Sequence, residues 1–227
     1  MINARGGDNH ETNLSPQRTD EVVPVKLLPL SLLAAALALG AITNAHAEDW
    51  FVRFGPTVVD PKSGNGSLAG GALQTDIKSQ TALGFTLGYH YTPNWAVELL
   101  ASTPFEHSVQ LNGDTALDFK HLPPTLSLQY YFLPEGKVNP FLGLGVNYTL
   151  TFSEKERGAL AGTNTKVGNS FGIAAQGGLV FKIADQWDIA ADIRWIDLDA
   201  SVKVNGAKVG TTHVDPLVYG LHLGYRF

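Results

Sequence analysis

Ionisable side chains recur at alternate positions within segments that are otherwise largely apolar. On the less apolar face of these segments lie Arg53, Glu98, Asp188, Asp192, Arg194, His222 and Arg226. Both signs of charge are present, so the groups could form ion pairs or a proton relay. They are spread over several segments, and no local motif places a nucleophile beside them. We therefore favour a structural network of ion pairs over a catalytic cluster.

A second polar group occurs between two of these segments, where His107, Ser108 and Asp114 precede His121. These residue types can form a hydrolytic site, but they are also common in loops. The sequence lacks HExxH, CxxC and GxxxxGK[ST] motifs, and it contains no cysteine for a disulfide or a thiolate metal site. We expect no enzyme activity, no cofactor and no metal.

Alternation of apolar and less apolar residues defines the elements that must position these groups. Eight segments of about ten residues show it, the length that a tilted strand needs to cross a bilayer. They are residues 50–59, 82–91, 95–105, 125–132, 141–152, 171–183, 187–195 and 217–227.

The links between these segments alternate in length. Short links cover residues 92–94, 134–139 and 184–186, and long polar links cover 60–79, 106–121, 153–169 and 200–213. Short turns at one rim and long loops at the other are typical of outer-membrane barrels. The prediction is an all-β fold, an eight-stranded antiparallel transmembrane β-barrel with short periplasmic turns and long extracellular loops.

A soluble β-sandwich or a lipocalin-like barrel would also alternate, and the polarity of the two faces decides between the folds. The less apolar face holds Gly, Ser, Thr, Gln and Asn with few charges. The apolar face carries aromatic residues near the strand ends, as a membrane barrel does at both interfaces. These are Trp50, Tyr91, Trp95, Phe132, Phe152, Trp187, Trp195, Tyr225 and Phe227.

A charge facing lipid at mid-depth costs roughly 2–4 kcal/mol, so the ionisable groups should point into the lumen. We expect them to plug its lower part, and a wide pore is not expected because eight strands enclose little more than side chains. The predicted plug comprises Arg53, Glu98, Asp192, Arg194, His222 and Arg226.

Toward the long-loop rim the inward positions become apolar, which suggests a funnel for a small apolar solute. The predicted hydrophobic passage comprises Val59, Leu100, Pro104, Ile196, Leu198 and Val218. Ordinary core packing at the barrel mouth would give the same pattern, so both interpretations stay open.

The N-terminal region has the order of a secretory signal peptide. Lys26 precedes the apolar residues 27–42, and an A-x-A cleavage motif follows at 45–47. A transmembrane anchor is the alternative. Residues 1–24 are polar and precede a normal signal start, which indicates a misassigned start codon. We expect a signal peptide over 25–47 and a barrel over 48–227, beginning at Glu48.

Four stretches resemble the OmpW family of small outer-membrane barrels, in order along the chain. They are "VELLASTPFEH" (97–107), "HLPPTLSLQYYF" (121–132), "NPFLGLGVNYT" (139–149) and "VDPLVYGLHLGYRF" (214–227). The resemblance implies an eight-stranded barrel with a hydrophobic passage open on the extracellular side. It implies uptake of small hydrophobic molecules, which leave sideways through the wall into the outer membrane.

Prolines give that lateral exit a possible location. Pro123 and Pro124 cannot donate ladder hydrogen bonds, and Pro104 lies near the end of the preceding strand. Together they predict a gap in the wall between the third and fourth strands. The alternative is that the prolines merely start a strand.

The C-terminal Tyr225 and Phe227 resemble the aromatic signal that such barrels present to their assembly machinery. The expected partners are outer-membrane lipid, small hydrophobic solutes, the barrel assembly machinery and periplasmic chaperones. The net charge of −5 argues against a nucleic-acid partner. A surface barrel that binds phage, colicin-like ligands or host factors without transport is the alternative function.

Overall fold

The computed structural model describes residues 50–227. The predicted upstream segment, signal peptide and start at Glu48 lie outside the described residues, as do the side chains of Leu73 and Gln74. Within residues 50–227 no helix has the length and apolarity to cross a membrane.

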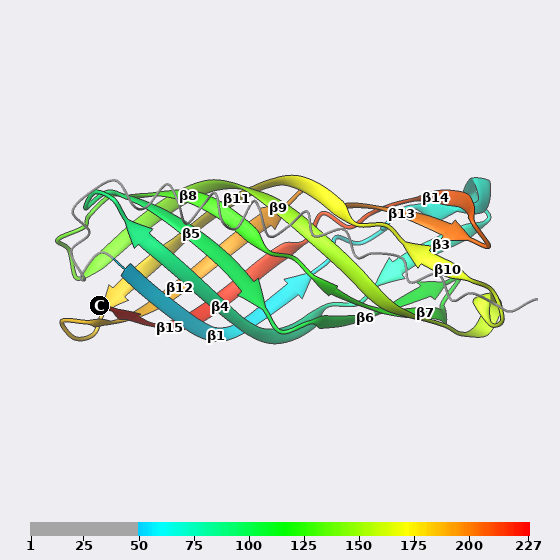
Figure 1. Cartoon of the computed structure of the whole chain (residues 1–227), viewed down its shortest axis with the longest axis horizontal. Helices are drawn as coiled ribbons and strands as arrows, with labels where there is room; N and C mark the ends of the chain where they lie inside the picture. Colours follow the sequence, from blue (N-terminus) through cyan, green and yellow to red (C-terminus); the bar gives the residue numbers. More distant parts are fainter. Residues whose placement is uncertain (1–49) are drawn as a thin grey trace, which may run out of the picture. The chain divides into compact units, whose positions relative to one another are not determined.

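Eight antiparallel strands close into a barrel, which confirms the predicted fold (Figure 1). Each strand pairs with the next along the chain, and the last pairs with the first. They are β1 (Trp50–Asp60), β4 (Gln80–His90), β5 (Trp95–Ser102), β8 (Thr125–Tyr131), β9 (Val138–Glu156), β11 (Ser170–Lys182), β12 (Trp187–Ile196) and β15 (Leu217–Arg226).

The seam between β15 and β1 runs from Phe51 opposite Arg226 to Asp60 opposite Leu217. The backbone N–H of Phe227 adds a hydrogen bond to the carbonyl of Trp50 at 3.1 Å. Closure matters because an open strand edge would leave N–H and C=O groups that lipid cannot satisfy.

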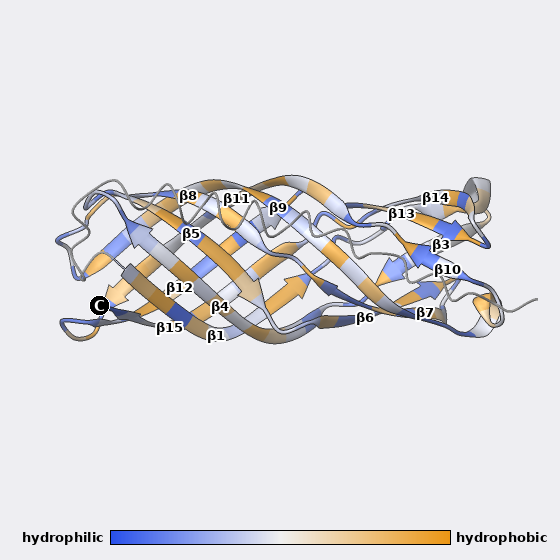
Figure 2. Ribbon diagram, in the orientation of Figure 1, coloured by the Kyte–Doolittle hydropathy of each residue, from blue (hydrophilic) through white to orange (hydrophobic). Residues whose placement is uncertain are grey.

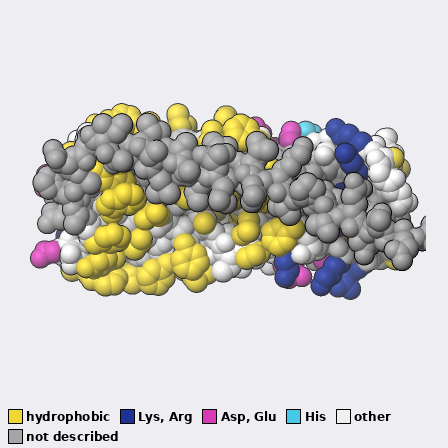
Figure 3. All heavy atoms as spheres, in the orientation of Figure 1, with side chains coloured by type: hydrophobic (Ala, Val, Ile, Leu, Met, Phe, Trp, Pro, Cys, Tyr) yellow, Lys and Arg dark blue, Asp and Glu magenta, His cyan; other side chains and the backbone are white. Residues whose placement is uncertain are grey.

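The alternation of the sequence separates the two surfaces of the barrel wall, as the banded colouring of the strands shows (Figure 2). Leu144 and Phe171 on the outside are 72% and 68% exposed, and large apolar side chains cover the outer surface of all eight strands. In Figure 3 the visible hydrophobic side chains gather over the barrel, and most visible Lys and Arg lie over the long-loop end. An apolar outer band of this kind fits a bilayer core.

The long links are themselves built largely of strands, and β9 continues beyond the predicted residue 152 to Glu156. The predicted segment 95–105 is divided, because Pro104 cannot continue the ladder between β5 and the next strand. The additional strands are β2 (Ser67–Leu68), β3 (Leu73–Ile77), β6 (Phe105–Leu111), β7 (Asp114–Leu122), β10 (Thr165–Val167), β13 (Asp199–Val204) and β14 (Ala207–His213). Two 3-10 turns, η3 (Ala69–Gly71) and η4 (Gly158–Leu160), complete this end.

Two hairpins of the long-loop end turn on Asn-Gly pairs. Asn112 and Gly113 join β6 to β7 with φ of 52° and 95°, and Asn205 and Gly206 join β13 to β14 with φ of 50° and 84°. Positive φ at both positions is the type I′ hairpin geometry, whose twist matches that of the strands and which Asn-Gly adopts readily. These turns extend the wall above the barrel, where β7 pairs with the upper part of β9.

Within residues 50–227 three apolar clusters occupy the inside, and one of them, formed by Leu68, Leu111, Ala116 and Val202, lies among the additional strands of the long-loop end. The long-loop cluster contains Val59, Phe105, Phe119, Ile196 and Leu198 among its members. The short-turn cluster consists of Phe51, Ala96, Tyr131, Phe141, Val180 and Ala190. Arg53, Gln176 and Arg194 lie between the long-loop and short-turn clusters along their strands.

Candidate functional site

The buried guanidinium of Arg53 is the centre of the lumen network. Its Nε donates to Asp188 Oδ1 at 3.0 Å and its Nη2 to Asp188 Oδ2 at 3.4 Å. Its Nη1 lies 3.3 Å from the Tyr131 hydroxyl and 3.7 Å from Glu98 Oε2. The guanidinium carbon also lies 4.2 Å from the centre of the Phe51 ring. Because the surrounding dielectric is low, these contacts are needed to offset the loss of water.

Glu98 joins the Arg53 group to a second arginine. Arg194 Nη2 donates to Glu98 Oε1 at 2.9 Å, and Arg194 Nε donates to Gln176 Oε1 at 2.7 Å. Five strands, β1, β5, β8, β11 and β12, thus contribute to one connected set. The alternation of the sequence placed these residues on one face, and barrel closure brings them into contact.

His222 and Asp192 form a third pair nearer the long-loop end of the network. His222 Nδ1 lies 3.4 Å from Asp192 Oδ1, and His222 Nε2 lies 3.0 Å from the Thr57 hydroxyl. Arg226, by contrast, makes no ion pair with any residue in 50–227, and its buried Nε has no partner there. It lies near the short-turn end, opposite Phe51.

Each of the eight barrel strands contributes at least one polar side chain that is no more than 6% exposed. From β1 to β15 these include Arg53, Thr86, Glu98, Gln129, Asn147, Gln176, Arg194 and His222. Side chains this buried leave little room for water at their level of the lumen. The arrangement can therefore act as a plug but offers no wide aqueous path.

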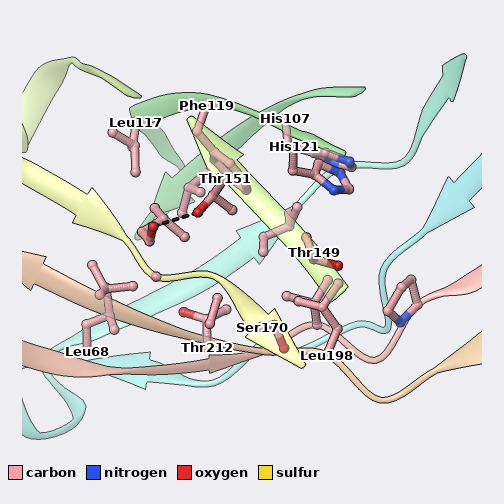
Figure 4. A pocket seen from close by; sticks show the side chains of 18 of the residues that line it. Leu68, His107, Leu117, Phe119, His121, Thr149, Thr151, Ser170, Leu198 and Thr212 are labelled. Atoms are coloured by element: carbon pink, nitrogen blue, oxygen red, sulfur yellow. Dashed lines mark hydrogen bonds between the residues drawn. The ribbon is translucent and has the colours of Figure 1, made fainter. Parts of the chain in front are cut away.

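An apolar cavity lies above the plug, among the strands of the long-loop end (Figure 4). Its empty space is about 760 Å³, part of it open to solvent. The apolar part of its wall includes Val59, Ile77, Leu117, Phe119, Val167 and Leu198. Thr149 on β9 and Ser170 on β11, which pair with each other, lie on the side toward the plug.

The predicted passage residues divide between this cavity and its surroundings. Val59 and Leu198 line it, and Ile196 and Val218 pack in the same apolar cluster without lining it. Leu100 is buried but lies outside that cluster. Pro104 is exposed in the link between β5 and β6, so its expected inward placement does not hold, since the chain leaves the β5 ladder before reaching it.

Two histidines face the cavity from neighbouring strands, His107 on β6 and His121 on β7 (Figure 4). They are 2% and 5% exposed, and their ring centres are 4.8 Å apart. Burial lowers the pKa of His107, and burial with the nearby His107 lowers the pKa of His121 to about 3. Both rings are therefore neutral at pH 7. The Asn-Gly turn is the sequence signal that could have placed them in one hairpin.

Ser108 does not act with these histidines. Its hydroxyl donates to Asp118 Oδ1 at 2.7 Å, while His107 Nδ1 bonds the backbone carbonyl of Lys78 at 2.8 Å. Successive residues of a strand point to opposite faces, so the side chains of His107 and Ser108 diverge. The nucleophile–base contact that a hydrolytic site requires is not formed by these residues.

The ladder between β5 and β8 ends at the predicted lateral opening. Its last pair is Leu100 with Thr125, and the next β5 residues, Ala101 and Ser102, pair only with β4. The buried Ser102 hydroxyl has no hydrogen-bond partner among residues 50–227. The wall thus loses its ladder where Pro124 and Pro123 precede Thr125.

The two prolines are fixed from the other side. The Asn147 side-chain amide donates to the carbonyls of Pro123 and Pro124 at 3.1 Å each, and the Tyr148 N–H donates to the Pro124 carbonyl at 3.1 Å. Pro104 lies exposed in the link that follows β5. At the interval where β5 and β8 are not paired, the Pro123–Pro124 segment is therefore held in place by its hydrogen bonds to β9.

Comparison with known proteins agrees with this architecture. The OmpW family model matches residues 46–227. Outer membrane protein W of Salmonella typhimurium is 36% identical over 212 residues, covering 89% of this chain and 100% of that protein. Outer membrane protein AlkL of Ectopseudomonas oleovorans is 28% identical over 228 residues, covering 89% and 97%. The crystal structure of OprG from Pseudomonas aeruginosa has a TM-score of 0.70 at 32% identity, covering 79% of this chain and 96% of that one.

Proposed function

The chain belongs to the OmpW family of outer-membrane barrels, and from this premise we propose that it takes up small hydrophobic molecules through the loop-end cavity. The observation that carries the proposal is the position of an apolar cavity directly above a polar plug. An apolar molecule gains by leaving water for such a wall. The proposal gives no residue a catalytic role and requires no metal or cofactor.

The polar plug makes onward passage down the lumen unfavourable for the same molecule. Entering it would separate Arg53 from Asp188 and Arg194 from Glu98, and each partner would remain buried without its counter-charge. An exit through the wall avoids that cost, because the outside of the wall is lipid. The proposed path therefore turns sideways above the plug.

The proposed exit is the interval beside Pro104, Pro123 and Pro124, where β5 and β8 are not paired. Separating two paired strands would break ladder hydrogen bonds in lipid, where no water replaces them. At this interval there are none to break between β5 and β8. A small molecule could leave here with less disruption than elsewhere along the described ladders.

Filling the cavity tests the uptake step. Ala200 lines the cavity, and Ala200→Phe should block it, whereas Ala207→Phe places the same ring on the exposed surface of β14. Uptake of a hydrophobic solute is measured in a strain lacking the chromosomal copy, with folding checked by heat-modifiable migration. We expect Ala200→Phe to abolish uptake of the solute and Ala207→Phe to leave it unchanged. Wild-type uptake by a folded Ala200→Phe protein would contradict the proposal.

The lateral step has its own test, replacement of Pro104, Pro123 and Pro124 by Thr so that the chain regains N–H donors. Pro56→Thr, on the exposed face of β1, is the matched control. Reduced release of solute into the outer membrane with the triple variant is expected. Unchanged uptake would count against the opening. Loss of phage or host-factor binding on deletion, with uptake intact, would instead favour the surface-interaction role.

A further inference from the structure

His107 and His121 are the two ionisable side chains in a cavity wall that is otherwise apolar or bears hydroxyl groups. The Nε2 atom of His107 and the Nδ1 atom of His121 are both buried, and neither has a hydrogen-bond partner among residues 50–227. Their neighbours are aromatic: Phe105 stacks on His121 with ring centres 5.4 Å apart, and Phe119 stacks on His107 at 6.0 Å. Leaving buried polar atoms unpaired is unfavourable, because the hydrogen bonds they made to water are not replaced.

The hydrogen-bond character of His107 follows from its other ring nitrogen. Nδ1 lies 2.8 Å from the backbone carbonyl oxygen of Lys78, which can only accept. Nδ1 must therefore carry the hydrogen, and in the neutral ring Nε2 is a bare acceptor. Nε2 of His107 therefore needs a hydrogen-bond donor, which residues 50–227 do not provide.

The hydroxyl groups of Thr149 and Thr151 in the same wall already donate to other acceptors, and Ser170 and Thr212 lie across the space from the two imidazoles (Figure 4). Thr149 donates its hydroxyl hydrogen to Asn147 Oδ1 at 2.7 Å, and Thr151 donates its own to the Val167 carbonyl at 2.6 Å. Phe119, Leu117 and Val109 have no donor to offer in their side chains. Figure 4 shows the two imidazoles together at one side of the space, with Thr149 and Thr151 apart from them.

We propose that the cavity selects apolar molecules bearing one hydrogen-bond donor, such as alkylphenols, whose hydroxyl donates to His107 Nε2. The apolar body then lies against the wall formed by Val59, Val167 and Leu198. This rests on the proposed uptake function and narrows its substrate class. A plain hydrocarbon of equal size fills the same space but leaves the histidine unpaired.

The test compares 4-propylphenol with 4-propyltoluene, in which a methyl group replaces the hydroxyl. The protein is labelled with ¹⁵N-histidine and methyl-labelled leucine and held in lipid nanodiscs, with empty nanodiscs correcting for partition into lipid. The phenol should bind about fivefold more tightly, the factor expected for one net hydrogen bond of about 1 kcal/mol. It should also move the His107 Nε2 resonance, whereas the toluene should perturb only Leu198 and its neighbours.

Two variants separate the contact from general effects on the fold. His107→Phe should bind the two compounds alike, and His213→Phe, at an exposed histidine away from the cavity, should keep the preference. The measurement on wild-type protein decides the matter even if His107→Phe does not fold.

The outcomes also separate this inference from the uptake function. Equal binding of both compounds at Leu198 would overturn the donor preference and leave uptake standing. An Nε2 resonance that is already hydrogen-bonded without ligand and unmoved by the phenol would overturn it too, since water would then be the partner. Perturbation of the cavity by neither compound would overturn the uptake function itself.

Discussion

The guanidinium of Arg53 holds the carboxylate of Asp188 at two points across the barrel interior. Nε–Oδ1 is 3.0 Å and Nη2–Oδ2 is 3.4 Å, and both side chains are almost fully buried. The two residues lie 135 positions apart, on β1 and β12, and β15 separates these strands in the sheet. Only a closed barrel with this register brings them together.

Breaking this pair should destabilise the barrel strongly. Asp188→Leu leaves the Arg53 charge buried beside Glu98 alone, and a loss of about 3–5 kcal/mol in the free energy of unfolding is expected. The double variant Arg53→Met with Asp188→Leu should recover most of it, because no charge is stranded. Denaturant unfolding in lipid vesicles, followed by tryptophan fluorescence, measures both. A double variant no better than Asp188→Leu would show that the pair acts by something other than its charges.

Gly88 should tolerate no side chain. A Cβ atom built there would lie 2.0 Å from Cζ of Phe51, a fully buried ring that also contacts Arg53. Gly88→Ala should therefore cost about 1–3 kcal/mol through forced repacking, and Phe51→Leu in the same chain should relieve part of it. Gly177→Ala is the control, since its nearest atom is the tip of the exposed Leu142 side chain at 3.0 Å. The same unfolding measurement applies, and equal losses for Gly88→Ala and Gly177→Ala would refute the prediction.

The β6–β7 hairpin should loosen in mild acid. The pKa of His121 in the folded protein is about 3, below its ordinary value of about 6.5. Between about pH 3 and pH 6.5 the opened hairpin therefore binds more protons than the folded hairpin. Stability is therefore complete above about pH 6.5 and falls as the pH decreases. At pH 5 His121 alone should cost about 2 kcal/mol. Hydrogen exchange of β6 and β7 amides, corrected for the intrinsic pH dependence, measures it. His121→Phe should flatten the response, and an unchanged slope in that variant would contradict the assignment.

The C-terminal aromatic residue should matter for assembly more than for the finished fold. Phe227 is 43% exposed, and its hydrogen bond to Trp50 uses only backbone atoms. Phe227→Ala should slow the appearance of heat-modifiable barrel in cells while changing the unfolding free energy by less than about 1 kcal/mol. Pulse–chase labelling gives the rate, with Leu221→Ala on the lipid-facing surface as the control. If Phe227→Ala assembled at the wild-type rate, the proposed role of Tyr225 and Phe227 as an assembly signal would be wrong.

Residue alternation was sufficient to predict the eight strands, their lipid-facing side and most of the charged lumen. Side chains alternate between the two faces of any strand, so this pattern can be read without knowing the tertiary structure. In every strand charged side chains favour the lumen and leucine favours the lipid. The predicted plug residues therefore face inward wherever the alternation is regular. Arg226 is set apart from the ion pairs because it lies at the strand end, beyond the charged groups that pair.

The loop-end structure could not be derived in this way. Pairing at the Asn112–Gly113 turn begins with Leu111 opposite Asp114 and Gln110 opposite Thr115. Continued without interruption, it would place His107 opposite Asp118 and put His121 on the other face of the hairpin. A bulge at this point shifts the register, so that Val109 pairs with Leu117 and His107 with Phe119.

The sequence by itself determined a membrane barrel, because in each strand apolar residues that face lipid alternate with less apolar residues that face the lumen. Tertiary structure alone decided which inward residues meet. The Arg53–Asp188 pair depends on barrel closure, and the shared face of His107 and His121 depends on one extra residue in a ladder. A shift of one position reverses every side chain of a strand, and such a shift is fixed by packing over the whole loop end rather than by any local pattern.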